Sequence, residues 1–123
     1  MKRFRTMLSA IGVALALSGA AHAQAVQGLD GDWTGKLEAG GATLTVIFHI
    51  KTADGKTTVT LDSPDQGAAG IPVNSIARDG QKVSMDVAAV MGSYAGMLAA
   101  DGKSIAGTWS QLDNSLPLTV TKK

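Results

Sequence analysis

The chain has 123 residues, a formal net charge of +1 and no cysteine. Without cysteine there is no disulfide, no thiolate nucleophile and no zinc–cysteine site, so packing and strand pairing must supply the stability. Three basic residues lie within the first five positions, and the rest of the chain holds 8 basic and 10 acidic residues without a basic cluster. That balance argues against nucleic acid and anionic lipid as partners.

The N-terminal segment has the pattern of a secretory signal peptide. Its basic residues are followed by an apolar run over 7–17 and by Ala21-His22-Ala23, a small-x-small cleavage signal. The apolar run is shorter than the roughly 20 residues that span a bilayer. We therefore expect 1–23 to be a signal peptide and 24–123 to form one domain. This domain should start near Gln24, carry no membrane anchor and be periplasmic or secreted.

The rest of the chain alternates apolar and polar residues between regularly spaced turn signals. Pairs such as Gly40-Gly41 and Asp54-Gly55 are typical of hairpin turns. Between the turns, period-two patterns predict eight strands, at 32–39, 43–51, 57–62, 71–78, 82–87, 93–99, 104–111 and 116–122. In the fourth of these the parity changes near Asn74-Ser75, which indicates a bulge. No capped helical pattern follows residue 23, so the predicted class is all-β.

Three of these strands place a glycine between two large apolar residues of the same parity. They are Trp33-Thr34-Gly35-Lys36-Leu37, Tyr94-Ala95-Gly96-Met97-Leu98 and Ile105-Ala106-Gly107-Thr108-Trp109. A glycine on a packed face gives room for a bend, which the closure of a small sheet requires. We therefore predict an eight-stranded antiparallel up-and-down barrel, with a two-sheet β-sandwich as the alternative.

Groups that could perform catalysis or bind a metal are sparse. His49 is the only histidine after residue 23, and its parity places it on the outer face. One histidine without cysteine predicts no ordinary transition-metal site. The serine of Gly92-Ser93-Tyr94-Ala95-Gly96 stands one place too early for a nucleophile elbow. The sequence thus predicts no catalytic residue, no cofactor and no metal, and we expect that the protein is not an enzyme.

The longest predicted loop, 63–70, is the best local candidate for a binding or interaction site, because long loops on rigid barrels often carry binding groups. With the end of the preceding strand, its candidate residues are Asp62, Ser63, Asp65 and Gln66. The alternative is an ordinary connection in which Pro64 ends the strand and glycines turn the chain. A further alternative pairs Asp62 with Asp65 as acid and base.

Three aromatic residues, Trp33, Tyr94 and Trp109, share the inward parity. An eight-stranded barrel is wide enough either to be filled by side chains or to hold one small ligand. These residues are therefore candidates for lining a ligand pocket, and the alternative is that they pack in the core.

The segment 61–73 reads Leu-Asp-Ser-Pro-Asp-Gln-Gly-Ala-Ala-Gly-Ile-Pro-Val, and the glycine-containing strands flank it on both sides. Together they resemble, over nearly the whole chain after residue 23, a small β-rich domain that lies N-terminal to the catalytic domain of some exported bacterial α/β-hydrolases. The resemblance implies a stand-alone accessory domain that lacks the hydrolase's serine nucleophile. The start Gly31-Asp32-Trp33 is also similar to lipocalins and avidins, which implies a lipocalin-like or streptavidin-like barrel.

These observations lead to three hypotheses about function. The first is an exported, non-enzymatic barrel that acts as an accessory or interaction module, associated with an exported serine hydrolase. The alternative is a carrier that binds a small apolar ligand inside the barrel. The third, an exported protease inhibitor, depends only on size, compartment and one protruding loop.

Overall fold

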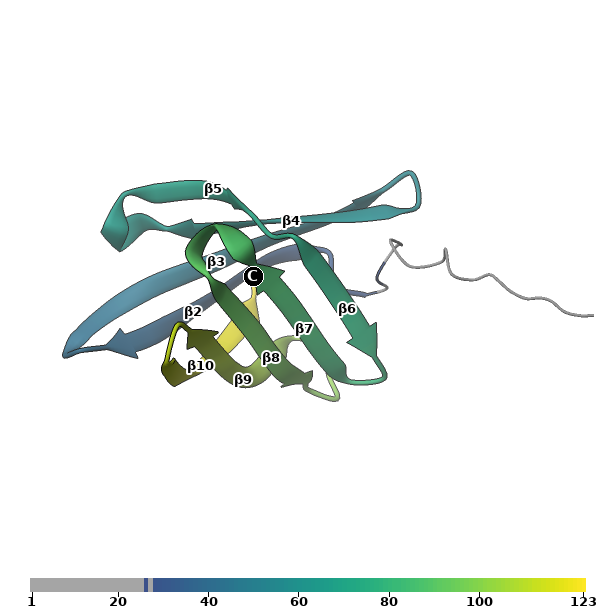
Figure 1. Ribbon diagram of the computed structural model, residues 1–123. Helices are drawn as coiled ribbons and strands as arrows, with labels where there is room; N and C mark the ends of the chain where they lie inside the picture. Colours follow the sequence, from purple (N-terminus) through teal and green to yellow (C-terminus); the bar gives the residue numbers. More distant parts are fainter. Residues whose placement is uncertain (1–25, 27) are drawn as a thin grey trace, which may run out of the picture.

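The computed structural model describes residue 26 and residues 28–123 (Figure 1). The predicted signal peptide, 1–23, and the expected start at Gln24 lie outside the described residues. Within the described part of the chain, no helix is both long and apolar enough to cross a membrane. The all-β prediction is confirmed, because the described residues form mainly strands, with two single-turn 3-10 helices.

Among the described residues, nine antiparallel strands form one sheet that curls into a half-barrel (Figure 1). The elements in chain order are β2 (Gly31–Ala39), β3 (Ala42–Ala53), β4 (Lys56–Ser63), η2 (Pro64–Gln66), β5 (Ala68–Pro72), β6 (Ser75–Asp79), β7 (Lys82–Val87), η3 (Ala88–Val90), β8 (Gly92–Leu98), β9 (Ser104–Gln111) and β10 (Asn114–Lys122). Across the sheet the order is β5-β4-β3-β2-β10-β9-β8-β7-β6. The prediction of eight strands in a closed barrel is therefore close but wrong in detail. The described strands do not divide into the two sheets of a sandwich.

The extra strand arises because the predicted strand 71–78 is two strands, β5 and β6, on opposite edges of the sheet. Between them, the Val73 backbone N–H donates to the Val59 carbonyl of β4 at 3.1 Å. The next N–H, of Asn74, donates to the Asp86 carbonyl of β7 at 2.8 Å. Residues 73–74 thus carry the chain from one edge to the other, and this crossing, rather than the expected bulge, explains the change of parity.

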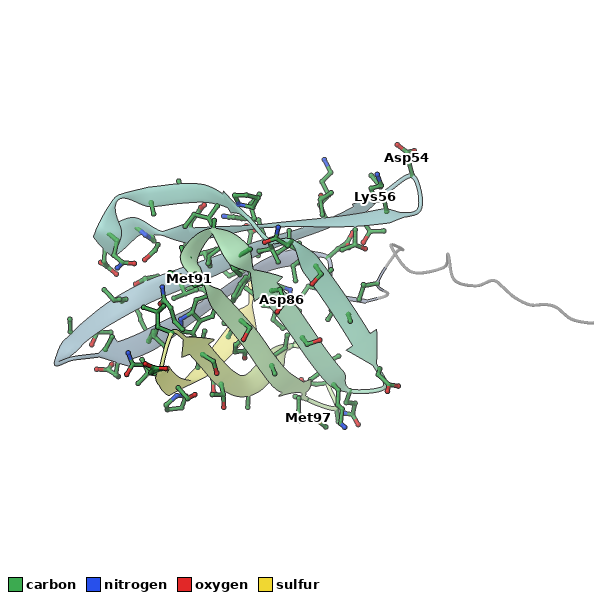
Figure 2. All side chains as sticks on the ribbon, viewed as in Figure 1. Asp54, Lys56, Asp86, Met91 and Met97 are labelled. Carbon is green, nitrogen blue, oxygen red and sulfur yellow. The ribbon has the colours of Figure 1, made fainter. Side chains whose placement is uncertain are left out.

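Tight turns connect consecutive strands at two of the predicted places. Gly40 and Gly41 join β2 to β3, with φ of 59° and 85°. Asp54 and Gly55 join β3 to β4, with φ of 54° and 73°, and Asp54 lies at the tip of this hairpin (Figure 2). Positive φ at both central residues matches the twist of the flanking strands, so these hairpins form without splaying.

The inner face of the curled sheet carries the core. Buried residues alternate with more exposed ones along the strands, as Val46, Phe48 and Ile50 do in β3. Leu44 and Leu116 have the same inward parity but are only partly buried, because they lie near one open end of the half-barrel. Side chains therefore fill the middle of the half-barrel more completely than this end.

The predicted role of glycine is visible where β8 and β9 meet. Gly96 and Gly107 are direct partners in this ladder. A Cβ added at Gly107 would lie 2.6 Å from the Gly96 Cα, and one at Gly96 would lie 2.8 Å from Ile105 Cγ2. Only glycine allows an approach this close, which permits the tight curl of the sheet here.

Candidate functional site

The predicted loop begins with a buried serine and a short helix. Ser63 ends β4 and is only 7% exposed, and Pro64, whose φ is fixed, starts η2 directly after it. The Ser63 hydroxyl donates to Gln66 Oε1 at 2.8 Å. Gly67 then reverses the chain with a φ of 67°, and its N–H donates to the Pro64 carbonyl. This local geometry turns Ser63 and Gln66 toward the interior end of the half-barrel.

A cavity of about 370 Å³ opens at this end of the half-barrel. It lies where the β2–β3 hairpin, η2, η3 and the β9–β10 turn gather, at the left of Figure 1. The residues that line it are Leu37, Ala39, Leu44, Val46, Leu61, Ser63, Gln66, Ile71, Val90, Trp109, Gln111, Leu112, Asn114 and Leu116. Ten of these fourteen are apolar, so the walls suit a hydrophobic molecule.

Of the three predicted aromatic residues, Trp109 is the one that lines this cavity. Its ring lies against Gly92 of β8, where an added Cβ would come within 2.7 Å of the ring atom Cη2. The Trp109 indole N–H donates to Gln111 Oε1 at 3.2 Å, and Gln111 Nε2 donates to the Val90 carbonyl at 2.9 Å. These contacts fix the indole and hold η3 beside the cavity.

Trp33 and Tyr94 are core residues instead. The Trp33 indole N–H donates to the Leu29 carbonyl at 2.8 Å, and the Trp33 side chain is fully buried. The Tyr94 hydroxyl lies 2.8 Å from the Leu118 carbonyl and 3.1 Å from the Ile105 carbonyl, so it stabilises β9 and β10. Burial raises the pKa of Tyr94 well above its ordinary value of 10.0, which keeps the phenol neutral.

Asp62 and Asp65 lie outside the cavity and have separate partners. One oxygen of Asp62 accepts the Gly70 N–H at 2.7 Å, and the other lies 2.7 Å from His49 Nε2. Asp65 Oδ2 accepts the Thr45 N–H at 2.6 Å, which anchors η2 to β3. The two carboxylates therefore fasten the loop to neighbouring strands, and they are not paired with each other as acid and base.

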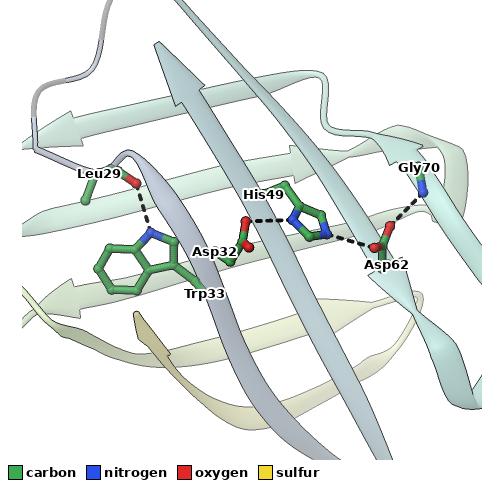
Figure 3. A network of polar contacts seen from close by, with 6 residues as sticks. All are labelled: Leu29, Asp32, Trp33, His49, Asp62 and Gly70. Atoms are coloured by element: carbon green, nitrogen blue, oxygen red, sulfur yellow. Dashed lines mark hydrogen bonds and ion pairs between the residues drawn. The ribbon is translucent and has the colours of Figure 1, made fainter. Parts of the chain in front are cut away.

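The sequence did not predict a charged cluster on the outer face, although it contains the residues that form it. His49 lies on the outer side, as its parity predicts, between Asp32 of β2 and Asp62 of β4 (Figure 3). Asp32 is its direct partner in the ladder, and Asp32 Oδ1 lies 2.7 Å from His49 Nδ1. The missing signal was the strand register, because parity alone does not show which residues stand opposite each other.

The geometry of this cluster fits a protonated imidazole. Both ring nitrogens of His49 face carboxylate oxygens, which can only accept hydrogen bonds when ionised. The hydrogen bonds to Asp32 and then to Asp62 raise the pKa of His49 above 6.5, against a smaller lowering effect of burial. The Gly70 N–H, followed by His49, lowers the pKa of Asp62 below 3.8. Within the described residues, no group of three metal-ligating side chains is arranged to hold an ion.

Two sequence comparisons give no relative from which a function could be transferred. Neither a scan against protein-family models nor a search of curated proteins finds a match to this chain. The candidate site therefore has to be interpreted from its own chemistry.

Proposed function

We propose that this protein binds a small, largely apolar molecule in the cavity at the open end of the half-barrel. The observation that supports this most is the cavity itself, about 370 Å³ in volume, with predominantly aliphatic walls and four polar lining residues. Ligand pockets in proteins typically occupy about 300 to 1,000 Å³ and have this kind of lining. Binding in such a space is favoured because apolar surface leaves water.

The packing of the half-barrel limits where the ligand can lie. Phe48 and Tyr94 fill the middle, with ring centroids 5.7 Å apart, and Trp33 is fully buried. The ligand space is therefore the end beyond these side chains. That space holds roughly a dozen water-sized groups of about 30 Å³ each, so a compact molecule is expected rather than a long-chain lipid.

The test is a titration of the isotopically labelled protein with naphthalene, a compact apolar molecule without a polar group. Backbone amide NMR shifts should change saturably around Gln66 and Gln111, which line the cavity, and not on the outer face of β7 and β8. Leu44→Trp places a large ring in the cavity and should abolish the shifts. Ala95→Trp adds the same ring on the exposed side of β8 and should leave them intact.

The proposal fails if naphthalene causes no saturable shifts. It also fails if the Leu44→Trp variant, with the circular dichroism spectrum of the parent, still binds as the parent does. The other hypotheses from the sequence, an accessory module beside an exported hydrolase and a protease inhibitor, stay predictions, because they depend on a protein partner rather than on this cavity.

A further inference from the structure

The cavity has four polar lining residues, which we call its polar rim, and all of them are uncharged. Ser63 and Gln66 come from the β4–β5 loop, and Gln111 and Asn114 come from the two sides of the β9–β10 turn. None of the described residues that line the cavity is a lysine, arginine, histidine, aspartate or glutamate. A ligand that buries its polar end here would meet amides and a hydroxyl, and no counter-charge.

The rim also carries side-chain N–H groups that have no hydrogen-bond partner among the described residues. Ser63 uses its hydroxyl hydrogen on Gln66 Oε1, which leaves the Gln66 amide nitrogen without a hydrogen-bond partner among the described residues. The Asn114 side-chain amide likewise has no partner within that part of the chain. Each side-chain amide nitrogen carries two hydrogens to donate, so the rim can serve an oxygen acceptor on a ligand.

The charges nearest the rim in sequence do not favour an anionic ligand. Asp65 adjoins Gln66, Asp113 adjoins Leu112 and Asn114, and Glu38 stands between Leu37 and Ala39. Lys36 also adjoins Leu37, but its ammonium donates to Thr45 Oγ1 at 2.9 Å on the outer face. A carboxylate that is buried among the lining residues would therefore lose its hydration without gaining a cation from any of them.

We propose that the ligand is a neutral amphiphile, an alkyl or aryl body with a hydroxyl, carbonyl or ester oxygen at the rim, rather than a fatty acid or an amine. Burying an unpaired charge costs far more free energy than burying a hydrogen-bonded neutral group. This difference favours a neutral ligand over a charged one. This inference rests on the proposed function, because it concerns the polar end of a molecule held in the same cavity.

The test compares three eight-carbon probes by calorimetry at pH 7.5: 1-octanol, octanoate and octylamine, the last of which is protonated at that pH. We expect octanol to bind, and each charged probe to bind at least about tenfold more weakly. Gln66→Lys should shift the ratio of octanoate to octanol affinity toward octanoate by about tenfold, because the new ammonium pairs with the carboxylate. Ser84→Lys adds the same charge on an exposed position of β7 and should leave the ratio unchanged.

The outcomes separate this inference from the proposed function. If neither naphthalene nor octanol binds, the proposed function is wrong, and the inference falls with it. If naphthalene binds and a charged probe binds as tightly as octanol, the cavity is a binding site but the assignment to neutral ligands is overturned. An unchanged ratio in the folded Gln66→Lys variant would show that the polar end of the ligand does not lie at this rim, and would also overturn the assignment.

Discussion

His49 and Asp62 connect β3 to β4 and, through Gly70, to the edge strand β5. The His49 Nε2 atom of β3 lies 2.7 Å from Asp62 Oδ2 of β4, and the second oxygen of the same carboxylate accepts the Gly70 N–H of β5 (Figure 3). With Asp32 on the other ring nitrogen, one row of polar contacts crosses four adjacent strands. The protonation state of one imidazole therefore affects how firmly the edge strand is held.

This relationship predicts a pH dependence of stability. The folded state raises the pKa of His49 above 6.5, so its stabilising contribution is fully present below pH 6.5 and is lost as the pH rises through the raised value. The pKa of Asp62 is lowered, so its contribution is present above pH 3.8 and is lost as the pH falls through the lowered value. We expect the cluster to stabilise most between about pH 4 and 6.5.

Thermal melting at pH 5 to 9 tests this expectation, with His49→Gln as the control that cannot titrate. Because the His49 side chain is 38% exposed, the effect should not exceed about 1 kcal/mol. The parent should lose stability relative to the variant between pH 6 and 9. Parallel curves for the two proteins would show that His49 titrates alike in the folded and unfolded states.

Gly107→Val should destabilise the fold by about 1 to 3 kcal/mol or more, because overpacking strains a rigid contact. The branched side chain would meet the β8 backbone at Ala95 and Gly96, which cannot move aside as a flexible side chain could. Urea denaturation measures the change. Ala106→Val, on the exposed face one residue earlier, should be nearly neutral, and equal stabilities of the two variants would contradict the close approach of β8 and β9.

Tyr94→Phe should lower the free energy of unfolding by about 1 to 2 kcal/mol, because buried carbonyl groups lose a donor. The affected carbonyls belong to Ile105 and Leu118, deep in the core. The affinity for naphthalene should not change, since Tyr94 does not line the cavity. A loss of binding without a loss of stability would reverse this assignment and move Tyr94 from the core into the ligand site.

Asp65→Ala should cost about 0.5 to 1 kcal/mol, because the exposed hydrogen bond to the Thr45 N–H is lost. Asp65→Asn keeps an acceptor oxygen and should recover part of that loss. Chemical denaturation of both variants gives the comparison. Full stability in Asp65→Ala would mean that this contact does not hold η2 in place.

Most strands could be predicted from the sequence, because burial on one face of a sheet makes apolar and polar residues alternate along each strand. The division of 71–78 into two strands could not be predicted this way. The pattern only changes parity near Asn74-Ser75, which a bulge would also produce, whereas the N–H groups of Val73 and Asn74 in fact bond to opposite edges of the sheet. β5 also begins at Ala68, where alanine and glycine give little indication of a strand.

Only part of the candidate site could be predicted from the sequence. Ser63, Gln66 and Trp109 line the cavity, whereas Asp62 and Asp65 belong to the same short loop region but do not line it. Parity separates inside from outside, but it cannot show which inward side chains fill the core, as Trp33 and Tyr94 do. That depends on the curvature of the sheet, and curvature is a property of all strands together.

Because the chain crosses between the two edge strands at residues 73–74, it could be circularly permuted by opening it there. β2 and β10 are the only paired strands that are distant in sequence among those described, and the Lys123 N–H donates to the Asp32 carbonyl at 2.9 Å. A chain opened between Val73 and Asn74, with Lys123 linked to residue 28, would run through the strands in their spatial order from β6 to β5. Every ladder would then join sequence neighbours, which lowers the contact order and should speed folding.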